Sequence, residues 1–596
     1  MAGTPYNRIL SPKYEDGNGT RRITEIASRN ALKSPRQIST TVTVTNVLLN
    51  TDGVSSHVMQ WGQFIAHEFT QLSLSDPTAA CCPDQIFLAS RNSSGTRAEL
   101  AEVRALVAEE RGEVCQQIEL KDDPVYGQDV CINHIRSAEA TPHNCVQGQR
   151  EQMNSITHVF DASNVYGSSQ ETQSTLRALT GGRMATQTIN GIVLPPADTA
   201  NCPANADRCP FAGGDNRINT TPNLVSAHTS FIIKHNQIAD ELAAINRNWD
   251  DERLFQETRR IIAAIQSNIH FYEWLPIVLG EPTIRKYRLQ RYDGYDSNVN
   301  PAIFNELAAA AFRFGHSLIN GRFVLEKDDG IDVTADLQIN FNNVTSIYND
   351  GTKQCIRGLS RDIPWRADKN FPAPMRDFLF NKMIDIVSLN INRGRDHGLN
   401  SYVDYRRHYR LSVPRNFNDL RATHPSDVVD QLSSLYTTVD DVELYIGGVT
   451  EFPVRGGLIG EVFANILGDG FRNSRKGDRF FFESSTSGLS RAQMDAIRRY
   501  SYAQLTCEAQ GLPTIVNQLF YNENVEGVRT VSCSSFPALD LNLWRDGGDV
   551  TPTCYWETAN IGPCCYSYRF ICRKCIGESR SCRCPGSWGL WERCEE

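Results

Sequence analysis

A segment near the start of the chain has the apolar spacing of a buried helix. Within residues 56–70, apolar side chains recur every three or four positions, which predicts an amphipathic and mostly buried helix. The apolar positions are Val58, Trp61, Ile65 and Phe69. Gln63 and His67 lie four residues apart and therefore share one face of this helix. This amide and imidazole could orient a small polar ligand and handle its proton; the alternative is that His67 is a hydrogen-bonded core histidine.

Similar periodicity elsewhere predicts a mainly α fold with few strands. We expect further helices over residues 97–112, 222–238, 252–279, 300–319, 375–392, 417–445, 457–471 and 490–511. No stretch of about 18 apolar residues occurs, so no membrane span is predicted. The net charge of -9 and the absence of a long basic run argue against a nucleic-acid partner.

The length of the chain and a change in its composition set the expected domains. A chain of 596 residues indicates either several domains or one large domain built around a cofactor. The composition changes near residue 546, and eight of the 18 cysteines follow that point. We therefore predict a main domain over residues 1–545 and a disulfide-linked, cysteine-rich C-terminal extension over residues 546–596.

The cysteine content also predicts an oxidising compartment and a secreted protein. Cys507 is expected to pair with Cys533. The glycosylation sequons at Asn18, Asn92 and Asn343 agree with secretion. Residues 1–30 lack the apolar core of a secretory signal, so we interpret the chain as a mature or trimmed form with an added methionine.

A cluster of oxygen-bearing side chains in residues 157–163 could bind a hard cation. Thr157, Asp161 and Ser163 flank Val159, whose backbone carbonyl could join them. Calcium takes six or more oxygen ligands, usually including carboxylates and backbone carbonyls. Glu68, next to His67, could supply a second carboxylate. The alternative is an ordinary solvated turn stabilised by Asp161.

Two further residues could act on a bound ligand. Arg217 lies just before the helix expected from Pro222, and its permanent charge could polarise a bound oxygen species, although a surface salt bridge is the commoner fate of an arginine. His316 lies on an expected helix with an alanine-rich centre, where small side chains leave space for a flat group. This setting suits an axial haem ligand. The alternative is a packed core histidine.

The segment after the expected helix at residues 375–392 could support such a ligand. A metal-binding imidazole needs an acceptor for its second ring N–H, and Asn390 could provide one. Arg393 could contact an acidic edge of a cofactor, or it could belong to a charge cluster with Asp396.

Five ordered motifs together resemble those of the animal haem peroxidases, in the peroxidase–cyclooxygenase superfamily. The motifs are Trp61-Gly62-Gln63-Phe64-x-x-His67, Asp161-Ala162-Ser163-Asn164-Val165-Tyr166-Gly167, Gly214-Asp215-x-Arg217, Phe312-Arg313-Phe314-Gly315-His316 and Asn392-Arg393-Gly394-Arg395-Asp396-His397-Gly398. The likeness covers residues 6–545 and is strongest to peroxinectin- and peroxidasin-type catalytic domains, with myeloperoxidase more distant. The cysteine-rich extension lies outside it.

The resemblance implies a single large helical domain around a buried haem and a role for each candidate residue. His67 would be the distal histidine that moves the proton of hydrogen peroxide, Arg217 would stabilise developing charge, and Gln63 would line the distal pocket. His316 would be the proximal iron ligand, held by Asn390. The remaining roles are contact with the cofactor for Arg313 and Arg393, and calcium binding for Glu68, Thr157, Val159, Asp161 and Ser163.

The chain departs from the family pattern where most members link haem through esters. Ala66 and Thr220 occupy the two positions of the ester-forming carboxylates, and Thr221 replaces the additional methionine link of myeloperoxidase. The calcium acid is Glu68 rather than the usual aspartate. We therefore expect haem b without ester links.

The resemblance implies a secreted enzyme that uses hydrogen peroxide. Without the electron-withdrawing esters, its expected donors are phenols or tyrosine, iodide and thiocyanate rather than chloride. The alternative is a catalytically weak or inactive protein of this fold that acts in the extracellular matrix, adhesion or defence. The extension over residues 546–596 could bind an extracellular protein partner.

Overall fold

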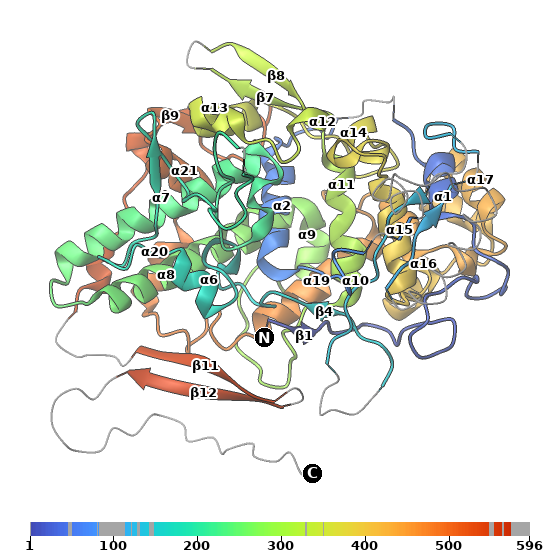
Figure 1. Ribbon diagram of the computed structural model, residues 1–596, viewed down its shortest axis with the longest axis horizontal. Coiled ribbons are helices and arrows are strands. Elements are labelled where there is room, and N and C mark those ends of the chain that lie inside the picture. The colour runs from blue at the N-terminus through green and yellow to red at the C-terminus, as the bar shows by residue number, and fades with distance from the viewer. Residues whose placement is uncertain are drawn as a thin grey trace.

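The computed structural model describes most of the main domain and a hairpin beyond it. The described residues are 2–45, 50–79, 81–82, 114–120, 122–127, 131–141, 148–204, 206–327, 330–349 and 351–546, together with the backbone of 553–562 and 565–573. The prediction of a mainly α fold is confirmed, since helices are the dominant regular structure of these residues and the strands are few and short (Figure 1). Among the described helices, none is both long and apolar enough to cross a bilayer. The helix expected over residues 97–112 and Asn92 lie outside the described residues.

The helices vary from single turns to 24 residues. In chain order they are α1 (Pro35–Val42), α2 (His57–Phe69), α5 (Ser163–Tyr166), α6 (Gln170–Thr175), α7 (Pro222–Ile245), α8 (Asp251–Asn268), α9 (Leu275–Lys286), α10 (Asn305–Ala309), α11 (Gly315–Leu318), α12 (Leu337–Asn340), α13 (Gly351–Arg361), α14 (Ala373–Arg376), α15 (Ile386–Asp396), α16 (Tyr402–His408), α17 (Ser426–Leu435), α18 (Leu444–Val449), α19 (Glu461–Lys476), α20 (Arg491–Arg498) and α21 (Tyr502–Gln510).

The described strands form only two-stranded antiparallel ribbons. The pairs are β1 (Thr4–Pro5) with β4 (Met153–Asn154), β2 (Ile118–Glu119) with β3 (Cys131–Ile132), β5 (Gln187–Ile189) with β6 (Ile192–Leu194), β7 (Arg322–Glu326) with β8 (Asp332–Asp336), β9 (Thr514–Val516) with β10 (Thr530–Ser532), and β11 (Thr553–Gly562) with β12 (Cys565–Arg573). The prediction of few strands is therefore confirmed. The boundary near residue 546 stays a prediction.

The helix expected over residues 56–70 is α2, and it lies near the centre of the molecule (Figure 1). Its apolar residues are buried in the main hydrophobic core, as the periodicity predicts. Helices α5, α7 and α11 pack against it. Residues 57–69 therefore connect parts of the chain that are far apart in sequence.

Several of the expected long helices are divided by caps. Asp385 accepts hydrogen bonds from the backbone N–H groups of Val387 and Ser388, so α15 begins at residue 386 and does not continue the turn of α14. Ser501 likewise caps α21 after α20 has ended. The expected helix over residues 417–445 is also divided, into α17, α18 and short 3-10 turns.

The expected helix over residues 300–319 is also wrong as a single element. It divides at Ala310, whose φ of -136° and ψ of -68° lie outside the helical region, into α10, a 3-10 turn over Ala311–Phe314, and α11. The side chain of Arg313 donates through Nε to the carbonyl of Ala308 at 3.0 Å. This bond satisfies a carbonyl near the end of α10 and directs the guanidinium back along the chain.

Four disulfides are present among the described residues. They are Cys81–Cys115, Cys82–Cys131, Cys202–Cys209 and Cys507–Cys533, of which the last was expected. Cys355 is buried and unpaired. Cys145 and the disulfide pairing of the extension fall outside what the structure describes.

Candidate active site

One face of α2 remains accessible although the helix lies inside the molecule. Met59, Gln63, Ala66 and Thr70 are partly exposed, at the three- and four-residue intervals of one helical face. Most other positions of α2 are buried, including His67. Gln63 and Ala66 therefore lie on the one face of α2 that is not fully buried.

A carboxylate connects the candidate distal residues. Asp215 starts the 3-10 turn over Asn216–Thr220 and accepts hydrogen bonds from Nε and Nη2 of Arg217 at 2.8 and 2.7 Å. Its Oδ1 lies 3.7 Å from Nδ1 of His67. Arg217 Nη2 also donates to the carbonyl of Thr70 at the end of α2, at 3.0 Å. Arg217 is therefore held beside the helix that carries His67.

The charges of this group favour a neutral imidazole. Burial, followed by the positive charge of Arg217, holds the pKa of His67 well below its ordinary value. Burial alone would raise the pKa of Asp215, but Arg217 and His67 outweigh it, so this pKa lies well below its usual range. A neutral His67 beside a fixed guanidinium can accept a proton at neutral pH.

The second candidate histidine meets its expected partner. His316, on α11, is partly exposed, and its Nδ1 lies 2.9 Å from the side-chain nitrogen of Asn390 on α15. Burial and then Arg313 lower the pKa of His316 to about 3, so the ring is neutral. Since α11 packs against α2, the helices that carry His316 and His67 are neighbours.

The direction of the Asn390 amide differs from our expectation. We expected its oxygen to accept the ring N–H of His316. Instead the oxygen accepts from Nη1 of Arg313 at 2.8 Å, and the amide nitrogen faces the ring. The guanidinium competes for the only acceptor of the side chain. A half-turn of the amide would restore the expected direction if Arg313 found another acceptor.

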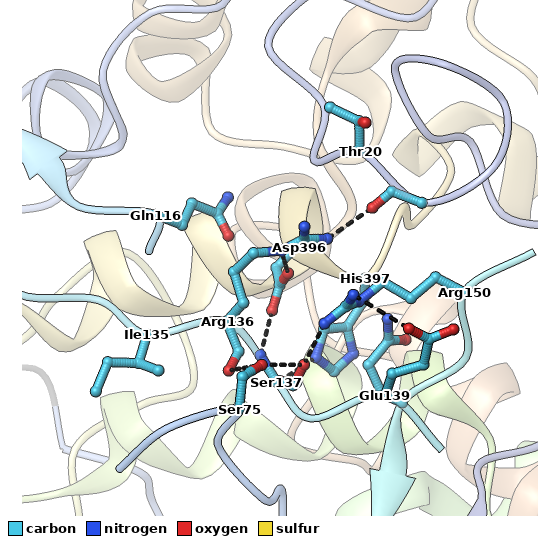
Figure 2. A network of polar contacts seen from close by, with 12 residues as sticks. Thr20, Ser75, Gln116, Ile135, Arg136, Ser137, Glu139, Arg150, Asp396 and His397 are labelled. Atoms are coloured by element: carbon cyan, nitrogen blue, oxygen red, sulfur yellow. Dashed lines mark hydrogen bonds and ion pairs between the residues drawn. The ribbon is translucent and has the colours of Figure 1, made fainter. Parts of the chain in front are cut away.

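Arg393 belongs to a buried network of polar groups. Its Nη1 donates to the carbonyl of Ile135, to Oγ of Ser137 and to Asp396, at 2.9–3.0 Å. Figure 2 shows Ser137 between Asp396 and His397. The cluster with Asp396 that the sequence left open as an alternative is thus present.

The histidine of this network is fixed as one tautomer. Nδ1 of His397 donates to the amide oxygen of Asn305 at 2.5 Å, because the amide nitrogen of Asn305 donates elsewhere, to Gln152. Nε2 of His397 then accepts from the hydroxyl of Ser137 at 2.7 Å. The Ser137 oxygen is left to accept from Arg393, so the chain of bonds orients that guanidinium.

The five candidate calcium residues come together at the end of α2. Thr157 Oγ1 donates to Asp161 Oδ1 and lies 2.9 Å from Ser163 Oγ. Ser163 Oγ donates in turn to the backbone carbonyl of Glu68 at 3.1 Å. The carbonyl of Val159 accepts from the backbone N–H of Asp161. Thr157, Asp161, Ser163 and the Glu68 carbonyl are therefore joined by one chain of hydrogen bonds.

Negative charge is incompletely balanced there. The two oxygens of Glu68 accept from the backbone N–H groups of Ala162 and Asn164. Burial and then the neighbouring Asp161 raise the pKa of Glu68 well above its ordinary value. Arg259 forms an ion pair with Asp161 at 3.3 Å. No group of three or more acidic, histidine or cysteine side chains suited to a metal occurs in the described residues, so a cation would depend on two carboxylates with hydroxyl and carbonyl oxygens.

The positions that replace the ester carboxylates are also defined. Ala66 is partly exposed on the accessible face of α2. Thr220 Oγ1 donates to the carbonyl of Arg217 at 2.7 Å, and Thr221 caps α7 through a bond from Leu224. The structure therefore gives both threonines local structural roles.

The sequence reasoning assigned no role to Asp215, Ser137 or His397. Asp215 was part of a quoted motif, and its place two residues before Arg217 was a usable signal. Ser137 carried no such signal, because the partners of its hydroxyl, Arg393 and His397, are 256 or more residues away.

Comparison with known proteins gives a consistent result. A family model described as animal haem peroxidase matches residues 1–520. A Drosophila melanogaster peroxidase is 32% identical over 578 residues, covering 92% of this chain and 80% of that protein. A Drosophila melanogaster chorion peroxidase is 31% identical, covering 91% and 68%. A peroxidasin homologue of Caenorhabditis elegans is 32% identical over 90% of this chain, which spans only 42% of that protein.

Solved structures share the fold. Peroxidase A of Dictyostelium discoideum matches with a TM-score of 0.70 and 25% identity, over 87% of this chain and 95% of that chain. A fatty acid alpha-dioxygenase of Oryza sativa matches with a TM-score of 0.66 at 16% identity, over 88% and 85% of the two chains, which shows a common fold alone.

Proposed function

The chain belongs to the animal haem peroxidase family and is a haem peroxidase, and on that premise we propose that His67 and His316 work on opposite sides of one haem. The observation that carries this proposal is the packing of α11 against α2, with His316 beside Asn390 and His67 beside Asp215 and Arg217. Each neutral imidazole thus has its own supporting polar groups. The substrates are hydrogen peroxide and small electron donors.

The residues fit a haem group. His316 is neutral and partly exposed, as an iron ligand must be, and the cationic side chains of Arg313 and Arg393 suit the carboxylates of a porphyrin. The bound iron would supply the redox chemistry that accepts the oxidising equivalents of hydrogen peroxide.

His67 and Arg217 would divide the work on peroxide. His67 takes the proton from one peroxide oxygen and returns it to the other, so that water leaves as the O–O bond breaks. Arg217, held by Asp215, stabilises the negative charge that develops on the leaving oxygen. Gln63 lies on the accessible face of α2 and orients the small ligand.

The haem is held without ester links. Ala66 has no carboxylate, and the hydroxyl of Thr220 is bonded to the Arg217 carbonyl. Retention then depends on His316, packing and contacts to the carboxylates, and the couple is less oxidising. Phenols or tyrosine, iodide and thiocyanate are therefore the proposed donors. Acid–organic extraction should remove the haem from the polypeptide; haem that stays attached would contradict this part of the proposal.

Calcium ties the end of α2 to residues 157–163. The proposed ligands are Glu68, Asp161, Thr157, Ser163 and the Val159 carbonyl. Burial and the nearby Asp161 raise the pKa of Glu68, and a divalent cation between the two acids would relieve that penalty beside the Arg259–Asp161 ion pair.

The protein is also proposed to be secreted. The four disulfides support an oxidising compartment. The cysteine-rich extension could bind an extracellular protein. A weakly active protein of the matrix, adhesion or defence is the second candidate, favoured by the absence of ester-forming carboxylates at Ala66 and Thr220.

A spectrum and one variant separate the two candidates. The purified protein should show a Soret band that changes when peroxide is added, and it should oxidise guaiacol or iodide. His67→Ala should keep the Soret band and lose about 100-fold or more in turnover. His408→Ala, at an exposed histidine, serves as the control. A Soret band without turnover in the unmodified protein would favour the second candidate.

A further inference from the structure

His134 is buried without a hydrogen-bond partner. His134 is only 3% exposed. In the part of the chain that the structure describes, neither of its ring nitrogens has a hydrogen-bond partner. A neutral imidazole always carries one N–H donor and one acceptor nitrogen. Buried polar groups of this kind are usually satisfied, so both ring nitrogens of His134 are free to bond to a group that the chain itself does not supply.

The surroundings of His134 are cationic. After burial, Arg393 and then Arg313 are the strongest influences that depress the pKa of His134. His134 precedes Ile135, whose backbone carbonyl accepts a hydrogen bond from Arg393 at 3.0 Å. The ring therefore lies within electrostatic range of both candidate cofactor arginines, although it comes from the segment after β3, far from them in sequence.

The two arginines have spare donors and too little counter-charge. In the described residues, every hydrogen bond of Arg393 uses Nη1, and those of Arg313 use Nε and Nη1. Arg313 forms no ion pair there. Asp396, the partner of Arg393, is shared with Arg136 at 2.7 Å. Two or more guanidinium nitrogens and one imidazole N–H are thus left for an anion.

We propose that His134 is a third contact for the haem carboxylates, donating its ring N–H to a carboxylate held by Arg313 and Arg393. This inference rests on the proposed haem site. A porphyrin with two carboxylates supplies the acceptors that these three residues lack, and a hydrogen bond from a neutral donor to a buried carboxylate is stronger than one between neutral groups.

The test compares two porphyrins that differ only at these carboxylates. Apoprotein is loaded with haem b or with its dimethyl ester, and the release of each to excess apomyoglobin is followed by the Soret absorbance. His134→Leu should release haem b at least about tenfold faster than the unmodified protein, while release of the dimethyl ester changes by less than about twofold. His134→Gln, which keeps an N–H donor, should restore slow release of haem b.

His270 offers a matched control. It is fully buried and also has two unpaired ring nitrogens in the described structure, but it stacks between Phe160 and Trp274, and burial lowers its pKa without the arginine influence seen at His134. His270→Leu should change the release of both porphyrins equally. His134→Phe provides a second apolar variant should His134→Leu not fold.

The outcomes distinguish the inference from the site on which it rests. If the His134 variants release both porphyrins equally fast, His134 acts through packing and the inference is overturned. Unchanged release of haem b overturns it as well. If the unmodified protein binds no haem b, the proposed function itself fails. That result differs from one in which the unmodified protein binds haem b and the His134 variants release it at the same rate.

Discussion

Nδ1 of His67 lies 3.7 Å from Oδ1 of Asp215, too far for a hydrogen bond but close enough for a strong electrostatic effect. The same carboxylate binds Arg217 through two nitrogens. Asp215 therefore holds the arginine and partly offsets its effect on the imidazole. His67, Asp215 and Arg217 therefore form a three-residue unit in which Asp215 connects the other two.

Asp215→Asn tests this unit. The amide keeps the volume but loses the charge that fixes Arg217, so the guanidinium should move from its place beside α2. We expect the rate constant for reaction with hydrogen peroxide to fall about 10- to 100-fold, with the Soret band of the resting protein retained. Stopped-flow absorbance measures this rate constant. Asp240→Asn, in an exposed ion pair with Arg183, should leave it unchanged.

The protonation of His67 predicts how the reaction depends on pH. Burial and Arg217 hold its pKa well below 6.5, so the neutral, proton-accepting form persists as the pH falls from 8 through 6.5. The peroxide rate constant should therefore stay level over that range and fall only at lower pH, where the ring becomes protonated. A midpoint near 6.5 in stopped-flow measurements would show that the imidazole is not shielded in this way.

The sequence was informative about local features and uninformative about competition between distant groups. The spacing within residues 56–70 located α2 because a helix places neighbours on the same face whatever surrounds it. The sequence also predicted Asn390 next to His316, a pairing that the resemblance implied. The direction of that amide depends on Arg313, 77 residues away in the chain, which takes its oxygen. Such competition is settled only by tertiary packing.

The breaks at Asp385 and Ala310 illustrate the same limit. An apolar pattern continues through residues 375–392 and 300–319, but a cap or a side-chain bond to a carbonyl stops the helix. Both breaks position site residues, since Asp385 starts the helix of Asn390 and the turn after Ala310 carries Arg313.

Asn390→Asp tests the contact to His316. A carboxylate would offer one oxygen to Arg313 and another to the ring N–H, so both groups would be bonded at once. The stronger acceptor makes the imidazole more electron-rich, and we expect the iron reduction potential to fall by about 60 mV or more. Spectroelectrochemistry measures this shift. Asn381→Asp, an amide in a turn outside the site, provides the control, and an unchanged potential would mean that residue 390 does not reach the proximal ring.

Glu68 links the calcium proposal to the distal helix. Its carboxylate is buried, lies near Asp161 and accepts from the backbone of residues 162 and 164, so a bound cation would relieve repulsion between the two acids. Chelation with EGTA should lower the thermal midpoint of the unmodified protein by several degrees, and added calcium should restore it.

The Glu68→Gln variant should be insensitive to both treatments, because it keeps the backbone contacts of one oxygen but loses the charge that binds the cation. Glu171→Gln, at an exposed acid on α6, should respond as the unmodified protein does. If neither EGTA nor calcium changes the thermal midpoint of the unmodified protein, the ion pair of Arg259 with Asp161 is sufficient to hold residues 157–163, and the calcium proposal is wrong.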